Sequence, residues 1–119
     1  RQGSEPKLKP VIKTAALLLA LAFAGAALAA QSYWIDVRTP QEFASGHVDG
    51  AINIPHTEIT ARIGEVTTDP DARLYLYCRS GGRSGAALQA LQAAGFTNAV
   101  NVGGLKDARR EAAELAAPD

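Results

Sequence analysis

Short apolar runs rich in β-forming residues alternate with helical patterns along most of this 119-residue chain. Strands are predicted at residues 33–37, 51–54, 74–77 and 99–102, and the run at 74–77 is the clearest of them. Helical spacing falls at 40–45, 57–63, 84–94 and 105–115. Strands that alternate with helices build parallel sheets covered on both faces. The sequence therefore predicts a single α/β domain with a small, mostly parallel sheet and helices on both faces.

Local signals predict where these helices begin, end and bury their side chains. Thr39, Pro40 and Glu42 form a capping-box pattern at the start of a short helix that Gly46 interrupts. Gly95 is expected to stop the helix at 84–94. The predicted buried face of that helix is Ala87, Leu88, Leu91 and Ala94, and that of the last helix is Leu105, Ala108, Ala112 and Leu115.

Residues 1–29 are predicted to be a signal peptide. A basic stretch ends at Lys13, an apolar run covers residues 15–30, and small residues at Ala27 and Ala29 suit a signal peptidase. The alternative is an uncleaved anchor, but 16 apolar residues fall short of the about 20 that a spanning helix needs. We therefore expect cleavage after Ala29, a domain over residues 30–119, a periplasmic location and no membrane contact after cleavage.

The charge of residues 30–119 argues against some classes of partner. This part has 8 basic and 11 acidic residues, a net charge of −3. A mildly acidic domain gives no electrostatic reason to expect nucleic acid. Two histidines and one cysteine form no metal-site spacing, so neither a metal nor a cofactor is expected. No long apolar stripe is left over, and we expect a monomer that acts on a small molecule.

The segment at 78–84 carries the predicted chemistry. Cys78 is the sole cysteine and follows the strand at 74–77, where ligands bind in parallel sheets. The glycines allow successive backbone N–H groups to point at one spot, and the following helix adds its positive end. Such surroundings stabilise a thiolate or an oxyanion and lower the pKa of a thiol. The candidate nucleophile is Cys78, and the candidate substrate-binding residues are Arg79, Ser80, Gly81, Gly82 and Arg83. The alternative is a surface loop with an incidental cysteine.

The chain resembles the rhodanese family over nearly all of the part that follows the predicted signal peptide. The matching motifs lie at 34–38, 46–55, 78–84 and 103–107. The resemblance implies a rhodanese-like fold and thiosulfate sulfurtransferase activity. In that reaction the cysteine takes the outer sulfur of thiosulfate, releases sulfite, and passes the sulfur to cyanide or another thiophilic acceptor. It also implies that Asp36 and Arg38 form a structural pair, and we expect a structural hydrogen bond at His47.

Two other functions remain open from the sequence. One is a sulfur carrier or binding module that serves another exported protein. The other is an oxyanion reductase or phosphatase on the same fold, a class whose loop resembles a Cys-x5-Arg pattern. Four residues separate Cys78 from Arg83 here, which favours the tighter loop of the sulfurtransferases.

Overall fold

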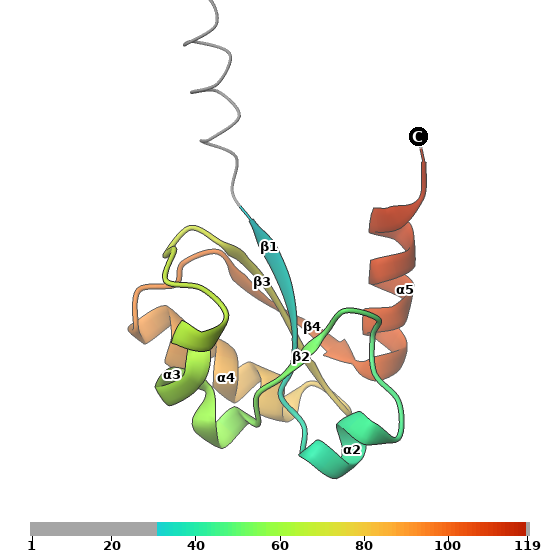
Figure 1. Ribbon diagram of the computed structural model, residues 1–119, viewed down its shortest axis with the longest axis horizontal. Helices are drawn as coiled ribbons and strands as arrows, with labels where there is room; N and C mark the ends of the chain where they lie inside the picture. The colour runs from blue at the N-terminus through green and yellow to red at the C-terminus, as the bar shows by residue number, and fades with distance from the viewer. Residues whose placement is uncertain (1–30, 119) are drawn as a thin grey trace, which may run out of the picture.

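The computed structural model describes residues 31–118, which form a four-stranded parallel sheet with strand order β2-β1-β3-β4 (Figure 1). The strands are β1 (Ser32–Asp36), β2 (Ile52–Asn53), β3 (Arg73–Cys78) and β4 (Ala99–Gly104). Each of the three neighbouring pairs is parallel, because a helical connection returns the chain before the next strand begins. The predicted parallel sheet is confirmed.

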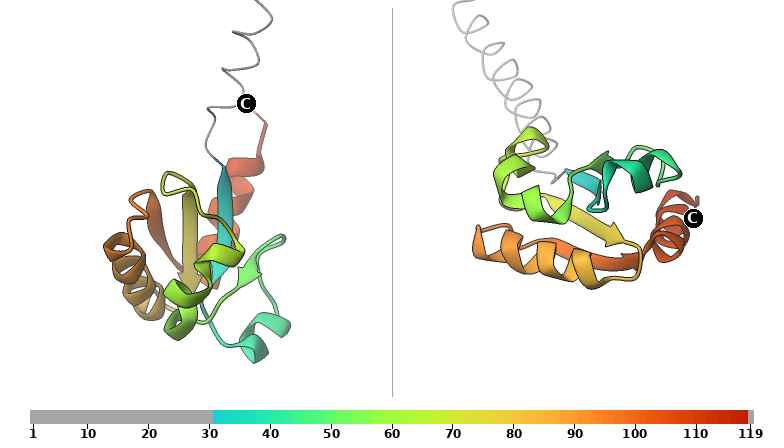
Figure 2. Two further views of the ribbon diagram at one scale, coloured as in Figure 1. Left: turned by 60° about the vertical axis from the view of Figure 1, so that its left-hand side comes forward. Right: turned by 90° about the horizontal axis from the view of Figure 1, so that it is seen from below.

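Helices cover both faces of this sheet (Figures 1 and 2). The longer helices are α4 (Gly82–Ala93) and α5 (Leu105–Ala116), and α2 (Pro40–Ala44) follows β1. The segment after β2 makes three short turns: η2 (His56–Glu58), α3 (Ile59–Arg62) and η3 (Ile63–Glu65). Helices α3 and α4 lie against one face, and α5 packs against β3 and β4 on the other.

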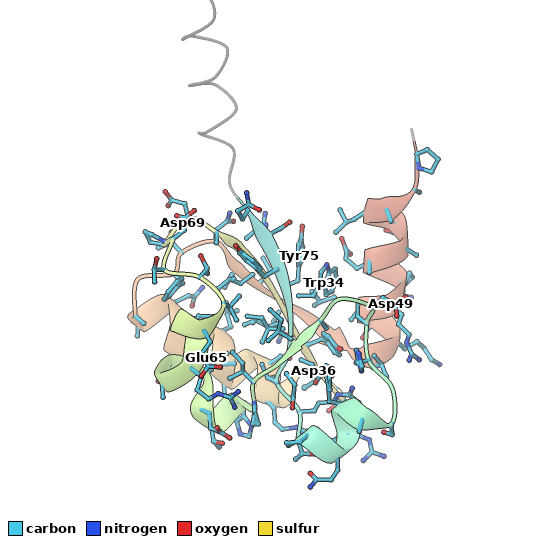
Figure 3. The ribbon with its side chains drawn as sticks, viewed as in Figure 1. Trp34, Asp36, Asp49, Glu65, Asp69 and Tyr75 are labelled. Carbon is cyan, nitrogen blue, oxygen red and sulfur yellow. The ribbon has the colours of Figure 1, made fainter. Side chains whose placement is uncertain are left out.

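Alternating side chains of the strands build a separate core on each face. On β3, Leu74, Leu76 and Cys78 join the cluster under α3 and α4, whereas Tyr77 joins a smaller cluster under α5. Trp34 of β1 belongs to that second cluster and lies on the same side as Tyr75 (Figure 3), with their ring centroids 4.6 Å apart. The period of two along a strand puts the cysteine on the face that α4 covers.

The predicted helix signals at α2 and α4 are confirmed. The Thr39 hydroxyl accepts a hydrogen bond from the Glu42 N–H at 3.2 Å, and the Glu42 carboxylate accepts one from the Thr39 N–H at 3.1 Å. Gly95 follows α4 with φ of +99°, a left-handed conformation that favours glycine at the end of a helix.

Two of the predicted buried side chains are exposed. Ala94 follows the last residue of α4 and lies at the surface, because the helix ends at Ala93. Leu115 is 54% exposed near the end of α5, which extends past the edge of the sheet. Helix α4 also begins at Gly82, two residues before the predicted start, since the chain turns at Gly81 with φ of +101°. Periodicity predicts a face, whereas the reach of the sheet decides how much of it is covered.

The predicted signal peptide at 1–29 and its cleavage after Ala29 lie outside the described residues. Within residues 31–118, no helix is long and apolar enough to cross a membrane. The same residues bring together no group of three histidine, cysteine, aspartate or glutamate side chains that could hold a metal ion.

Candidate active site

Cys78 is the last residue of β3, and the residue is buried at 1% exposure. It pairs with Gly104 of β4. A Cβ atom at Gly104 would collide with the backbone carbonyl of Arg79, so only glycine allows the loop to leave the sheet this close to β4. The sheet and its neighbouring strand therefore hold the sulfur at the carboxyl edge, where the sequence predicted it.

The loop curls around the sulfur atom and directs hydrogen-bond donors at it. The Gly81 N–H donates to Cys78 Sγ at 2.9 Å, and the Ser84 hydroxyl lies 3.4 Å from the same atom. The left-handed conformation of Gly81 makes this turn, and α4 begins at the next residue. The positive end of α4 thus starts beside the sulfur.

These donors favour the thiolate form of Cys78. Burial by itself raises the pKa of the thiol. Hydrogen bonds from the Ser84 hydroxyl and from the backbone N–H groups of Ser84, Ser80 and Gly81 outweigh that effect and lower the pKa to about 7. A large share of the cysteine is consequently ionised at neutral pH, and the thiolate is the nucleophilic form.

This pKa can be measured from the pH dependence of Cys78 alkylation by iodoacetamide. The rate should rise about tenfold per pH unit on the acid side and level off above the pKa of about 7. Ser84→Ala removes the hydroxyl donor and should move the midpoint up by about one pH unit, the size of one hydrogen bond to a charged group. Thr68→Ala removes an exposed hydroxyl away from the Cys78 loop and should leave the midpoint unchanged. An unchanged midpoint in Ser84→Ala would contradict the claim that the Ser84 hydroxyl lowers the pKa of Cys78.

Asn101 of β4 is a site residue that the sequence analysis missed. The Ser84 hydroxyl lies 2.7 Å from the Asn101 side-chain oxygen, and its one proton can be donated either to that oxygen or to Cys78 Sγ. The same oxygen accepts a hydrogen bond from the Gly103 N–H at 3.0 Å, and the Asn101 amide donates to the Gly81 carbonyl at 3.0 Å. The β3–β4 register shifts beside it, where Leu76 pairs with Asn101 but Tyr77 pairs with Gly103. The shift sets the Asn101 side chain against the loop, and it positions both the hydroxyl and the turn.

The two arginines of the loop differ in their surroundings. Arg83 makes a bidentate ion pair with Glu42 of α2, with nitrogen–oxygen distances of 2.7 and 3.0 Å. Arg79 is exposed and makes no ion pair with any residue in 31–118. The sequence predicted a full positive charge on each. In the structure a carboxylate compensates one of them, and the role of both in substrate binding stays a prediction.

Beneath the loop, Asp36 and Arg38 form the structural pair that the sequence analysis expected. The Arg38 guanidinium reaches the carboxylate at 2.6 Å and donates to the Gly46 carbonyl at 2.7 Å. Burial raises the pKa of Tyr77 to about 12, and its hydroxyl accepts a hydrogen bond from the Val48 N–H at 3.0 Å. Figure 3 places Asp36 at the end of the sheet that α2 approaches. These groups fix the underside of the site and do not touch the sulfur.

The histidines lie apart from the sulfur's hydrogen bonds. His47 Nδ1 lies 2.8 Å from the Phe43 carbonyl, and the two rings stack with centroids 3.7 Å apart. The structural role expected for His47 is therefore confirmed. A hollow of about 500 Å³ opens between this segment and α5, beside Asp49 in Figure 3. It is lined by residues 47–49 with Arg109, Ala112, Ala113 and Ala116, so the Cys78 loop is not part of it.

The chain is similar to known proteins of one family. A family model described as a rhodanese-like domain matches residues 15–111. The thiosulfate sulfurtransferase PspE of Escherichia coli is 42% identical over 97 residues, which cover 82% of this chain and 92% of PspE. A sulfurtransferase of Allochromatium vinosum is 35% identical and covers 71% of this chain and 78% of its own length. A solved structure described as a rhodanese with anions from E. coli has a TM-score of 0.62 and 43% identity, covering 64% of this chain and 89% of its own.

Proposed function

The chain belongs to the rhodanese-like family and is a sulfurtransferase, and we propose that it moves sulfur from thiosulfate to a thiophilic acceptor, cyanide or a thiol, through a persulfide on Cys78. The observation that carries this proposal is the sulfur of Cys78 at the end of β3, with the Gly81 N–H and the Ser84 hydroxyl directed at it.

In the first half-reaction the Cys78 thiolate attacks the outer sulfur of thiosulfate. The new bond joins Sγ to that sulfur, the bond between the two thiosulfate sulfurs breaks, and its electron pair leaves with sulfite. One thiolate charge and two thiosulfate charges become one persulfide charge and two sulfite charges. In the second half-reaction cyanide or a thiolate attacks the outer persulfide sulfur, and Cys78 leaves as a thiolate.

The loop supplies what both half-reactions need. Backbone N–H groups of residues 79–83 and the start of α4 stabilise negative charge on the terminal sulfur, whether it belongs to the thiolate or to the persulfide. Arg79, exposed at the mouth of the loop, attracts an anionic donor. No general base is required, because a pKa of about 7 already leaves much of the thiol ionised at neutral pH.

The proposal is tested by measuring the intact mass of the protein after thiosulfate alone and again after cyanide. We expect a gain of one sulfur atom, its loss on addition of cyanide, and steady formation of thiocyanate when both are present. Mass gain that only a partner protein, and not cyanide, can reverse would support the sulfur-carrier alternative instead. No mass gain with thiosulfate would contradict the persulfide route.

A phosphatase or an oxyanion reductase fits the loop less well. Four residues lie between Cys78 and Arg83, and the loop closes so far that the Gly81 N–H touches the sulfur itself. An enclosed ring of this size favours a single sulfur atom over a tetrahedral oxyanion.

We further propose export to the periplasm with cleavage after Ala29, as the sequence predicts.

A further inference from the structure

Glu42 stands at the mouth of the Cys78 loop and is held there from two sides. From its own helix, the Thr39 N–H and the Thr39 hydroxyl each lie 3.1 Å from Oε1. From α4, both terminal nitrogens of Arg83 donate to the two carboxylate oxygens. The side chains of the pair are only 27% and 30% exposed. A carboxylate with this many donors does not swing away to release the arginine.

The pair leaves the loop with less positive charge than its sequence suggests. The hydrogen bonds from Arg83 and Thr39 lower the pKa of Glu42 to about 2, so the carboxylate is ionised throughout the range in which the cysteine works. The hydrogen bond that Arg83 donates to Glu42 is likewise the main reason why the pKa of Arg83 is raised, and the Cys78 thiolate adds to it. Arg83 thus lies within electrostatic reach of the thiolate while its own charge is compensated, whereas Arg79 has no carboxylate partner among residues 31–118.

We propose that Glu42 is a specificity-determining residue. It compensates the charge of Arg83 and thereby lowers the preference of the site for dianionic sulfur donors over monoanionic ones. The inference rests on the proposed persulfide route. Attraction between a loop cation and a donor scales with the donor's charge, so each uncompensated arginine favours a dianion over a monoanion. Because Glu42 compensates Arg83, only Arg79 contributes to the preference for a dianion over a monoanion.

Thiosulfate and methanethiosulfonate form a matched pair of donors for testing this. Both present a terminal sulfur bonded to a second sulfur that carries oxygens, but the first is a dianion and the second a monoanion. Attack by Cys78 gives the same persulfide, with sulfite leaving in one case and methanesulfinate in the other. Since both donors meet the same thiolate, the ionisation of Cys78 cancels in the ratio of their kcat/KM values.

The decisive variant is Glu42→Gln, which keeps an oxygen to accept hydrogen bonds and removes the charge. We expect the kcat/KM ratio of thiosulfate to methanethiosulfonate to rise about fivefold, the upper end of what one solvent-exposed charge pair contributes. The change should fall mainly on the KM for thiosulfate. It should shrink at high salt, since the Debye length is only about 3 Å at 1 M ionic strength.

Two further variants separate charge from structure. Glu65→Gln removes a carboxylate that pairs with Arg62 on the surface, and it should leave the ratio unchanged. In the double variant Glu42→Gln, Arg83→Gln the extra positive charge is gone, and the ratio should return to that of the unmodified protein. Thermal unfolding of each variant shows that it is folded.

The outcomes distinguish this inference from the function on which it rests. If neither donor adds sulfur to the unmodified protein, the persulfide route fails and the role of Glu42 fails with it. If the persulfide forms but Glu42→Gln changes kcat/KM for both donors by the same factor, Glu42 is only a structural anchor for Arg83 and the inference is overturned alone.

Discussion

Cys78→Ser is expected to lower kcat/KM for sulfur transfer from thiosulfate to cyanide by about 10³-fold or more, which corresponds to roughly 4 kcal/mol of lost transition-state stabilisation. The loop brings the pKa of the thiol to about 7, but the same donors cannot ionise a serine hydroxyl near neutral pH. An oxygen in place of Sγ also has no route to a persulfide. Thiocyanate formation is the measurement.

The structure supplies controls for this variant. Cys78 is the only cysteine in the chain, so a thiol reagent should react with one group in the unmodified protein and with none in the variant. The substitution is nearly isosteric at a position with 1% exposure, and thermal unfolding should show a folded domain. Turnover above a tenth of the original rate in a folded variant would mean that Cys78 is not the nucleophile.

Arg38→Leu is expected to destabilise the domain by about 3–5 kcal/mol, because it leaves the Asp36 carboxylate charged and buried without its partner. Asp36 is fully buried, and the guanidinium provides three of the hydrogen bonds to its oxygens, at 2.6 to 3.1 Å. In the variant the carboxylate keeps the Arg38 backbone N–H at 3.0 Å. Small domains are stable by only about 5–15 kcal/mol, so the loss would take much of the total. Urea unfolding measures it.

Matched variants show whether the cost comes from burial. Arg62→Leu breaks exposed ion pairs with Glu58 and Glu65 and should cost less than about 1 kcal/mol. The double variant Arg38→Leu, Asp36→Asn removes the buried charge and should restore part of the lost stability. It is the variant to measure if Arg38→Leu alone does not fold. A cost for Arg38→Leu as small as that for Arg62→Leu would contradict the role given to this pair.

Much of the fold and the central residue of the site could be predicted from the sequence because their signals are local. The alternation of strands and helices led to a parallel sheet, and the capping box at Thr39 and the stop at Gly95 need only a few neighbouring residues. The Cys78 loop could also be predicted, since the cysteine, the turn at Gly81 and the start of α4 follow one another in the chain. Local hydrogen bonds and backbone conformations do not depend on the rest of the fold.

Ala94 and Leu115 are exposed, although the sequence predicts both on buried helix faces. Both continue an apolar spacing in the sequence, but α4 ends at Ala93, one residue before Ala94. Whether that face is covered depends on where the sheet ends, which is set by the pairing of strands far apart in the chain. A helical pattern contains no information about the length of the surface opposite it.

By itself, therefore, the sequence determined the class of fold, the position of the proposed nucleophile at the end of a strand and the ring of backbone groups behind it. Tertiary structure alone decided which distant side chains tune that ring. Glu42 is 41 residues from Arg83 and Asn101 is 17 residues from Ser84, and each pair meets only because parallel strands bring their carboxyl ends to one edge of the sheet. The charge presented to a substrate is the sum over neighbours in space, so the compensation of Arg83 could not be foreseen from residues that are neighbours in sequence.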